Sequence, residues 1–123
     1  MLNIRQLLGI KGEASAVRFL KKNGCAIIET NYRTRLGEID IVASDGDIIV
    51  FVEVKTRKKE GMISPKEAVT PSKQRTISKL AQTWLKSKGK YGMKARFDVI
   101  AIISDRESER IEWVKNAFES PTF

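Results

Sequence analysis

Hydrophobic positions recur along the chain with two periods, one typical of helices and one typical of strands. Apolar side chains three and four positions apart predict an amphipathic helix over residues 4–22 and a second one that begins near Thr70. The inward stripe of the first helix contains Ala16, Val17 and Leu20, with Leu7 and Leu8 a little earlier. The stripe of the second helix contains Ile77, Leu80, Ala81, Trp84 and Leu85.

Glycine, proline and a capping residue mark the ends of these helices. Gly24 follows Lys22 in the position where glycine commonly ends a helix. Thr70 is a suitable N-cap for the second helix, and Pro71 suits its first helical position. The glycine-containing segment 88–92 ends that helix.

Five segments with strand character separate and follow the helices. A turn signal at residues 44–47 divides two of them, and glycine and proline predict a loop over residues 60–65. The predicted strands cover residues 26–33, 38–43, 48–56, 95–103 and, as a short edge strand, 110–114. The order of helix, three strands, helix and two strands predicts a single α/β domain, residues 1–123, built around a mixed sheet.

Charge is distributed unevenly along the chain. Residues 36–54 carry five acids and no base, whereas residues 55–96 carry 13 bases and two acids. The net charge of +8 and the basic flanks suit a polyanion such as nucleic acid, provided that a cation neutralises the acidic segment. The plain alternative is a soluble protein with a mixed charged surface.

Composition excludes several classes of protein and site. No apolar run approaches the roughly 18 residues that a membrane span needs, and the start of the chain lacks signal-peptide features, so we expect a cytoplasmic location. The chain has one cysteine, Cys25, and no histidine, which excludes an internal disulfide and argues against structural zinc. Any metal must therefore be bound by oxygen atoms, which points to Mg²⁺ or Mn²⁺.

The acidic segment acquires chemical meaning from strand geometry. Side chains alternate between the faces of a strand, so Glu38 and Asp40 share one face of the second strand, while Glu53 and Lys55 share one face of the third. A two- or four-residue loop that makes paired positions sum to 91 places Asp40 opposite Phe51 and Glu38 opposite Glu53. Asp40 then lies diagonal to Glu53 on the same face.

Such a group of carboxylates must be protonated, paired with a base or bound to a cation. Asp40 and Glu53 can hold a divalent ion, the backbone carbonyl of Val54 is a further oxygen ligand, and Lys55 can orient a nucleophile and stabilise charge on a phosphate. These are the parts needed to hydrolyse a phosphodiester with a metal ion. The plain alternative is a set of surface salt bridges on an exposed sheet face.

The motifs around these residues resemble a known nuclease signature and a known family. Gly37-Glu38-Ile39-Asp40, a 12-residue gap and Glu53-Val54-Lys55 resemble the PD-(D/E)xK signature, with Ile39 at the place of the signature proline. The longer frame consists of Gly12-Glu13, Asn31-Tyr32-Arg33, Gly37-Glu38-Ile39-Asp40, Val50-Phe51-Val52-Glu53-Val54-Lys55-Thr56-Arg57, Arg96-Phe97-Asp98-Val99 and Asn116-Ala117-Phe118. This frame resembles the YraN-like family of bacterial proteins, which is similar to archaeal Holliday junction resolvases.

The resemblance implies a restriction-endonuclease-like fold, in which helices flank a central mixed sheet of four or five strands. It implies a metal site at Asp40 and Glu53, with Lys55 as the catalytic lysine. Resolvases act on branched DNA as dimers, so the resemblance also implies a homodimer, for which the sequence shows no interface.

Further residues have a functional and a structural interpretation. Glu13 is either an additional metal ligand or a first-turn carboxylate that complements a helix dipole, and Lys73 either enters the cleft or reaches solvent. Asp98 is expected to be structural and to pair with a base. The predicted phosphate contacts are Arg33, Arg35, Arg57, Lys58, Lys59, Lys73 and Arg75.

Three functions are compatible with these features. The first is a metal-dependent DNA endonuclease, with DNA as its partner and without a membrane partner. The second is a non-catalytic module that binds DNA or RNA through the same fold. The third is a protein-interaction domain, which is expected to retain no DNA even at low salt.

Overall fold

The computed structural model describes residues 4–58, 69–104 and 108–120, and side chains from Gly12 onward except that of Lys58. Its elements are α1 (Ile4–Lys22), β1 (Ala26–Thr34), β2 (Gly37–Asp45), β3 (Ile48–Lys58), α2 (Pro71–Ser87), β4 (Ala95–Ser104) and β5 (Glu109–Phe118). This order confirms the predicted α/β class and the sequence of elements. Within the described ranges, neither helix is long and apolar enough to cross a membrane.

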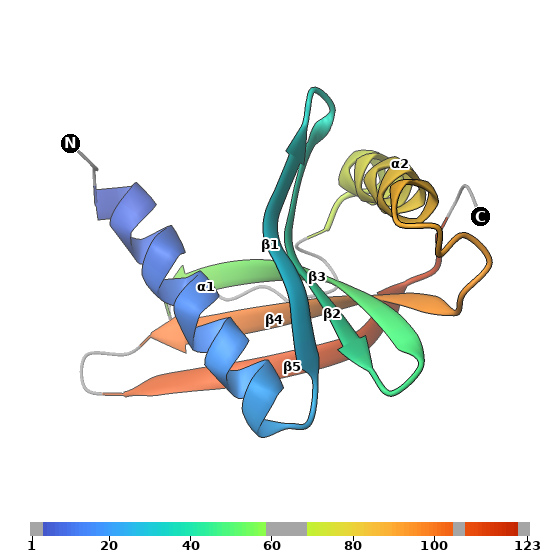
Figure 1. Ribbon diagram of the computed structural model, residues 1–123. Helices are drawn as coiled ribbons and strands as arrows, with labels where there is room; N and C mark the ends of the chain where they lie inside the picture. The colour runs from blue at the N-terminus through green and yellow to red at the C-terminus, as the bar shows by residue number, and fades with distance from the viewer. Residues whose placement is uncertain (1–3, 59–68, 105–107, 121–123) are drawn as a thin grey trace.

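The five strands form one mixed sheet in the order β1-β2-β3-β4-β5. β1, β2 and β3 pair antiparallel, β3 and β4 pair parallel, and β4 and β5 pair antiparallel. The parallel step needs a crossover, which α2 provides. α1 and α2 cover different faces of the sheet, and the β1–β2 hairpin projects beyond it (Figure 1). This is the flanked mixed sheet that the restriction-endonuclease-like resemblance implies.

Each helix packs its apolar stripe on one face of the sheet. Ala16 and Leu20 of α1 join a cluster with inward residues of β2, β3 and β4, with Val17 at its margin. The α2 stripe joins a second cluster, in which the Phe51 and Trp84 rings meet edge to face at 5.8 Å between centroids. Such a contact contributes about 1 kcal/mol beyond area burial. The predicted positions Leu7 and Leu8 lie outside the described side chains.

The capping prediction for α2 is confirmed. The Thr70 backbone is extended, and its hydroxyl oxygen accepts a hydrogen bond from the Lys73 amide at 3.2 Å, with Pro71 at the first helical position. This bond satisfies one of the donors that a helix start leaves free. It also fixes the first turn of α2, which carries Lys73 toward the sheet.

The predicted register of the β2–β3 hairpin was wrong by two residues. Val42, not Asp40, lies opposite Phe51, and the ladder runs from Asp45–Ile48 to Ile41–Val52. The strands extend further than the turn signal indicated, so only Gly46 and Asp47 remain in the loop. A shift of two preserves the faces, because side chains repeat every two residues. Continued by one pair, the observed register brings Asp40 beside Glu53.

The ladder ends at that point because β2 departs from strict alternation. Ile39 packs in the α2 cluster with Val42, whereas Ile41, two positions from Ile39, packs in the α1 cluster on the other face. Asn31 lies beside this segment in β1, where its φ of 55° is left-handed, a conformation that asparagine tolerates. β2 and β3 therefore separate, and the candidate site lies in the opening.

β5 is longer than the predicted strand 110–114. It pairs with β4 from Ser104–Glu109 to Phe97–Phe118, with a register shift between Phe97 and Val99. Asn116, with a φ of 52°, belongs to this irregular segment. Val114 and Phe118 are four positions apart on β5, but their partners Val99 and Phe97 are two apart on β4, so regular pairing is interrupted before the strand ends.

Candidate functional site

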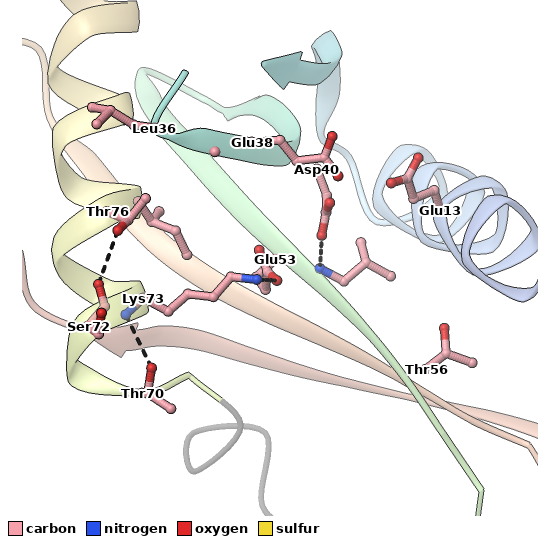
Figure 2. Close-up of a pocket in the computed structure, with 13 residues that line it drawn as sticks. Glu13, Leu36, Glu38, Asp40, Glu53, Thr56, Thr70, Ser72, Lys73 and Thr76 are labelled. Atoms are coloured by element: carbon pink, nitrogen blue, oxygen red, sulfur yellow. Dashed lines mark hydrogen bonds and ion pairs between the residues drawn. The ribbon is translucent and has the colours of Figure 1, made fainter. Parts of the chain in front are cut away.

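A cavity of about 570 Å³ lies where β2 and β3 separate. Four elements line it: α1, the β1–β2 hairpin, β3 and the first turns of α2. Figure 2 shows the acidic side chains entering it from α1, β2 and β3, while Lys73 reaches across from α2. Residues separated by up to 60 positions in the sequence, Glu13 and Lys73, thus line one pocket.

Asp40 is the most constrained carboxylate of this cavity. Its side chain is buried, at 9% exposure, and Oδ2 accepts a hydrogen bond from the Val54 amide at 2.8 Å. Burial and the charge of Glu53 raise its pKa from 3.8 to about 7, although the Val54 bond opposes the rise. The same amide bond fixes the aspartate across the opening between β2 and β3.

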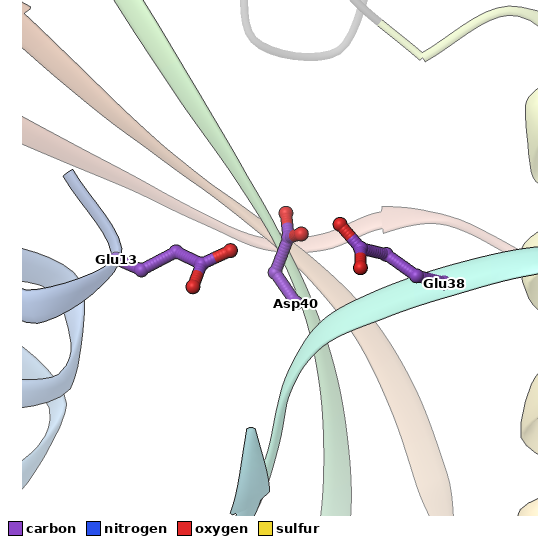
Figure 3. Close-up of side chains that lie close together, drawn as sticks. All are labelled: Glu13, Glu38 and Asp40. Atoms are coloured by element: carbon purple, nitrogen blue, oxygen red, sulfur yellow. The ribbon is translucent and has the colours of Figure 1, made fainter. Parts of the chain in front are cut away.

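Asp40 belongs to a group of three carboxylates. One oxygen each of Glu13, Glu38 and Asp40 lie within 4.8 Å of one another (Figure 3). Burial raises the pKa of Glu13, and hydrogen bonds with Asn31 and Asp40 oppose that rise. In the described part of the chain, no lysine or arginine forms an ion pair with Glu13 or Asp40.

Glu13 reaches this group because α1 approaches β3 closely. A Cβ atom added at Gly12 would lie 2.7 Å from Oγ1 of Thr56, so a larger residue would push the helix away. α1 begins at Ile4, which places Glu13 in the middle of the helix. The alternative of a first-turn carboxylate was therefore wrong.

Glu53 has a different environment. It is 7% exposed, and Oε1 lies 3.3 Å from Lys55 Nζ and 2.9 Å from Lys73 Nζ. Burial lowers the pKa of Lys73, but the hydrogen bond and charge of Glu53 outweigh it and raise the pKa. The burial of Asp40 and Glu53 contradicts the alternative that these acids form salt bridges on an exposed sheet face.

The donor set fits a hard divalent cation. Glu13, Glu38 and Asp40 offer carboxylate oxygens, which Mg²⁺ and Mn²⁺ prefer. Burial, and after it the charges of Glu53, Glu13 and Glu38, raise the pKa of Asp40, so the charged form of this carboxyl is disfavoured. A bound cation would relieve that repulsion, as protonation does in its absence.

The predicted basic contacts are distributed around the cavity rather than in it. Arg33 forms an ion pair with Glu38, and Arg35 and Arg75 are exposed. The Arg57 guanidinium donates to the carbonyl oxygen of Thr56 at 3.0 Å. The side chain of Lys58 and all of Lys59 lie outside the described residues. Among the members of this set whose side chains are described, only Lys73 lines the cavity, which favours the interpretation that it enters the cleft.

Three lining features were absent from the sequence-based site. Glu38 shares the Gly37–Asp40 motif, and its alternation with Asp40 was a usable signal. Ser72 and Thr76 line the α2 wall, but hydroxyls on a helix carry no distinctive sequence pattern. Leu36 forms part of the wall near the hairpin tip, where a hydrophobic residue in a turn was the available signal.

The fold and this oxygen-rich cavity define a mixed α/β protein with an acidic site enclosed between two helices. The chain belongs to the uncharacterised protein family UPF0102, whose model matches residues 12–102. This confirms the YraN-like resemblance seen in the motifs.

Three relatives illustrate the similarity. A UPF0102 protein of Pelotomaculum thermopropionicum is 48% identical over 120 residues, covering 96% of this chain and 100% of the relative. One from Geobacter sulfurreducens is 52% identical over 115 residues, covering 93% and 90%. One from Rhodococcus jostii is 49% identical over 112 residues, covering 90% and 95%. The similarity therefore extends over nearly the whole length of each chain.

Proposed function

We propose that this protein is a DNA endonuclease that hydrolyses phosphodiester bonds with Mg²⁺ or Mn²⁺ at the Asp40–Glu53 cavity. The observation that carries the proposal is the buried Asp40, which lies among three other carboxylates and has a pKa raised to about 7. Burying charged carboxylates together costs folding free energy unless a cation compensates for their charge. Sites that carry this cost are commonly functional.

The carboxylates and the lysine of the cavity have different proposed roles. Asp40 and Glu53 are the proposed ligands of the ion, with Glu13, Glu38 and the Val54 carbonyl as further ligands. The Val54 amide keeps Asp40 oriented through its hydrogen bond. When bound, the ion would act as a Lewis acid and would lower the pKa of a water molecule bound to it. Lys55 lies beside Glu53, and its ammonium group can donate hydrogen bonds to the phosphate oxygens.

Nucleic acid is the proposed partner because the cavity has a basic surround. Lys73 enters it from α2, and Arg33 and Arg35 lie on the projecting hairpin. These charges attract a phosphate backbone, whereas the carboxylates repel it in the absence of a cation. Binding of metal and of DNA should therefore reinforce each other. A homodimer remains a proposal from the resolvase resemblance.

The test is a cleavage assay on labelled DNA in Mg²⁺ and in Mn²⁺. Branched, flapped, duplex and single-stranded substrates are compared for wild type, Asp40→Ala and Lys55→Ala. We expect both variants to lose at least about 100-fold in rate, because each removes charge stabilisation from the reacting phosphate. Glu112→Gln, on an edge strand, is the matched control for a removed carboxylate. Absence of cleavage by wild type on all substrates would refute the enzymatic proposal.

One observation favours a second candidate, a non-catalytic nucleic-acid-binding module. Glu53 carries two lysine partners, Lys55 and Lys73, which can neutralise it without a metal. A module of this kind is expected to bind DNA with strong salt dependence and to keep its affinity in Asp40→Ala and Glu53→Gln. The endonuclease predicts instead that both variants lose their response to Mg²⁺.

A further inference from the structure

The β1–β2 hairpin extends beyond the sheet and forms one wall of the cavity. Its ladder continues to the pair Thr34–Gly37, whereas the β2–β3 ladder ends at Ile41–Val52, and Figure 1 shows the hairpin standing clear of the other strands. Tyr32 packs against the α2 cluster. This packing fixes the hairpin beside the cavity.

Gly37 makes that anchoring possible. A Cβ atom at this position would lie 3.4 Å from Cγ2 of Thr76, and the φ of 148° disfavours side chains. The hairpin thus contacts α2 close to its tip. A site on an element fixed in this way presents its side chains with little freedom.

The residues of the turn are not those that a tight hairpin favours. Arg35 and Leu36 alone connect the strands, where two-residue loops prefer Gly, Asn or Asp. The Thr34 hydroxyl compensates by accepting a hydrogen bond from the Leu36 amide at 3.1 Å. Positions that depart from local turn rules are commonly functional.

Leu36 is the most exposed large hydrophobic side chain in the described part of the chain, at 59%. A single exposed leucine ordinarily needs no explanation. This one lines the acidic cavity (Figure 2), and its neighbours Arg33 and Arg35 carry positive charge. An apolar side chain directly after an arginine combines a group that can insert between bases with a charge that can hold the backbone.

The size of the cavity limits which form of DNA can enter. Its 570 Å³ suits a ligand the size of one or two nucleotides. A B-form duplex is far thicker, since its major groove alone is about 12 Å wide. One strand can enter this cavity, with a phosphate near Lys73, only if it leaves the duplex nearby.

We propose that Leu36 is a wedge that stacks against the last base pair where a duplex opens into single strand. Arg35 holds a phosphate of the strand that continues into the cavity. The protein thereby selects flapped or branched DNA over blunt duplex. This inference rests on the proposed function in that it takes DNA as the partner, but it does not require cleavage.

The test measures binding of the full chain in Ca²⁺, a hard cation suited to oxygen ligands, with the DNA checked for integrity. A flapped duplex and a blunt duplex of equal length carry 2-aminopurine at the junction position. We expect the wild-type protein to bind the flapped duplex more tightly than the blunt duplex. Binding should also raise the fluorescence of 2-aminopurine, because that base is unstacked at the junction. Leu36→Ser should lose about tenfold in affinity for the flap and little for the blunt duplex, and Leu36→Met should retain the preference.

The matched control is Ile28→Ser, which removes an apolar side chain that is 41% exposed on β1 but does not line the cavity. Equal affinity for flap and blunt duplex, or equal effects of Leu36→Ser and Ile28→Ser, would overturn the wedge while leaving any cleavage untouched. A flap preference that Leu36→Ser removes, without cleavage in Mg²⁺ or Mn²⁺, would support the wedge and reject the endonuclease. Failure to bind any DNA would overturn both.

Discussion

Two groups of buried acids in this protein differ in how their charge is satisfied. Asp98 of β4 has a fully buried side chain that accepts hydrogen bonds from Arg96 Nε at 3.0 Å, Trp113 Nε1 at 2.8 Å and the Asn116 amide at 3.1 Å. Arg96 also binds Asp45 at 3.0 Å. Asp40, by contrast, accepts its hydrogen bond from an amide and faces other carboxylates.

The difference separates a structural acid from the acid that we propose to be functional. A buried carboxylate with a cation and several donors stabilises its charged form, and its network is complete without a ligand. In the cavity, burial and neighbouring carboxylates instead disfavour the charged form of Asp40, so a proton or a metal ion stabilises this residue. Variants at the two aspartates should therefore have opposite effects on folding.

The largest effect is expected at the satisfied site. Asp98→Ala leaves the largely buried Arg96 guanidinium without one of its two carboxylate partners, and it also removes the acceptor of the Trp113 and Asn116 donors. We expect a loss of about 3–5 kcal/mol in the free energy of unfolding, measured by urea denaturation. Asp98→Asn, which keeps acceptor atoms, should lose less. A loss below about 1 kcal/mol for the alanine variant would show that the network contributes little.

Asp40→Asn should change stability in the opposite direction. The raised pKa of Asp40 means that the folded state holds a proton more tightly than the unfolded chain. Metal-free wild type should therefore lose stability as the pH rises from about 4 to about 7, by at most about 4 kcal/mol. The asparagine variant should be flatter over this range and more stable at pH 8. Parallel pH profiles in urea would contradict the assignment.

Much of the fold could be predicted because its signals are local. Alternation in residues 38–43 and 48–56 placed both strands, and the Thr70–Pro71 cap placed α2. The register could not be predicted, since it depends on where the hairpin turn closes. The end of β5 was hidden by a bulge at Asn116.

The candidate site was only partly readable for a related reason. Asp40 and Glu53 occupy neighbouring strands, so alternation alone brought them into one region. Glu13 and Lys73 reach the same cavity from separate helices, and their positions depend on tertiary packing such as the close approach at Gly12. The role that we propose for Leu36 depends on the opening between β2 and β3, which no sequence pattern encodes.

A smaller effect is expected from Mg²⁺, which should relieve the repulsion around Asp40. At pH 8 and ten times its dissociation constant, Mg²⁺ should stabilise the fold by about 1.4 kcal/mol. That corresponds to a rise in Tm of about 4 °C for a chain of this size. The rise should shrink at pH 5, where protons compete for Asp40, because the pKa of this carboxyl lies near 7.

Asp40→Asn should abolish this stabilisation, whereas Glu112→Gln, which alters an exposed pair with Arg110, should keep it. An equal rise in Tm for wild type and Asp40→Asn would place the ion elsewhere. Thermal unfolding monitored by circular dichroism, with and without Mg²⁺, gives both measurements.

The smallest effect is expected at Lys73. This lysine forms an ion pair with the buried Glu53, while its own side chain remains partly exposed, so it shares features of both groups of acids. Lys73→Met should weaken DNA binding about threefold and lower the slope of log affinity against log salt by about 1, since one phosphate contact is lost. The same variant should bind Mg²⁺ more tightly, because the ammonium group no longer competes for Glu53. Lys79→Met, an exposed lysine on the same helix that does not line the cavity, is the control. If both variants behave alike in DNA and Mg²⁺ titrations, Lys73 acts only as general positive charge, and Glu53 belongs with Asp98 among the structural acids.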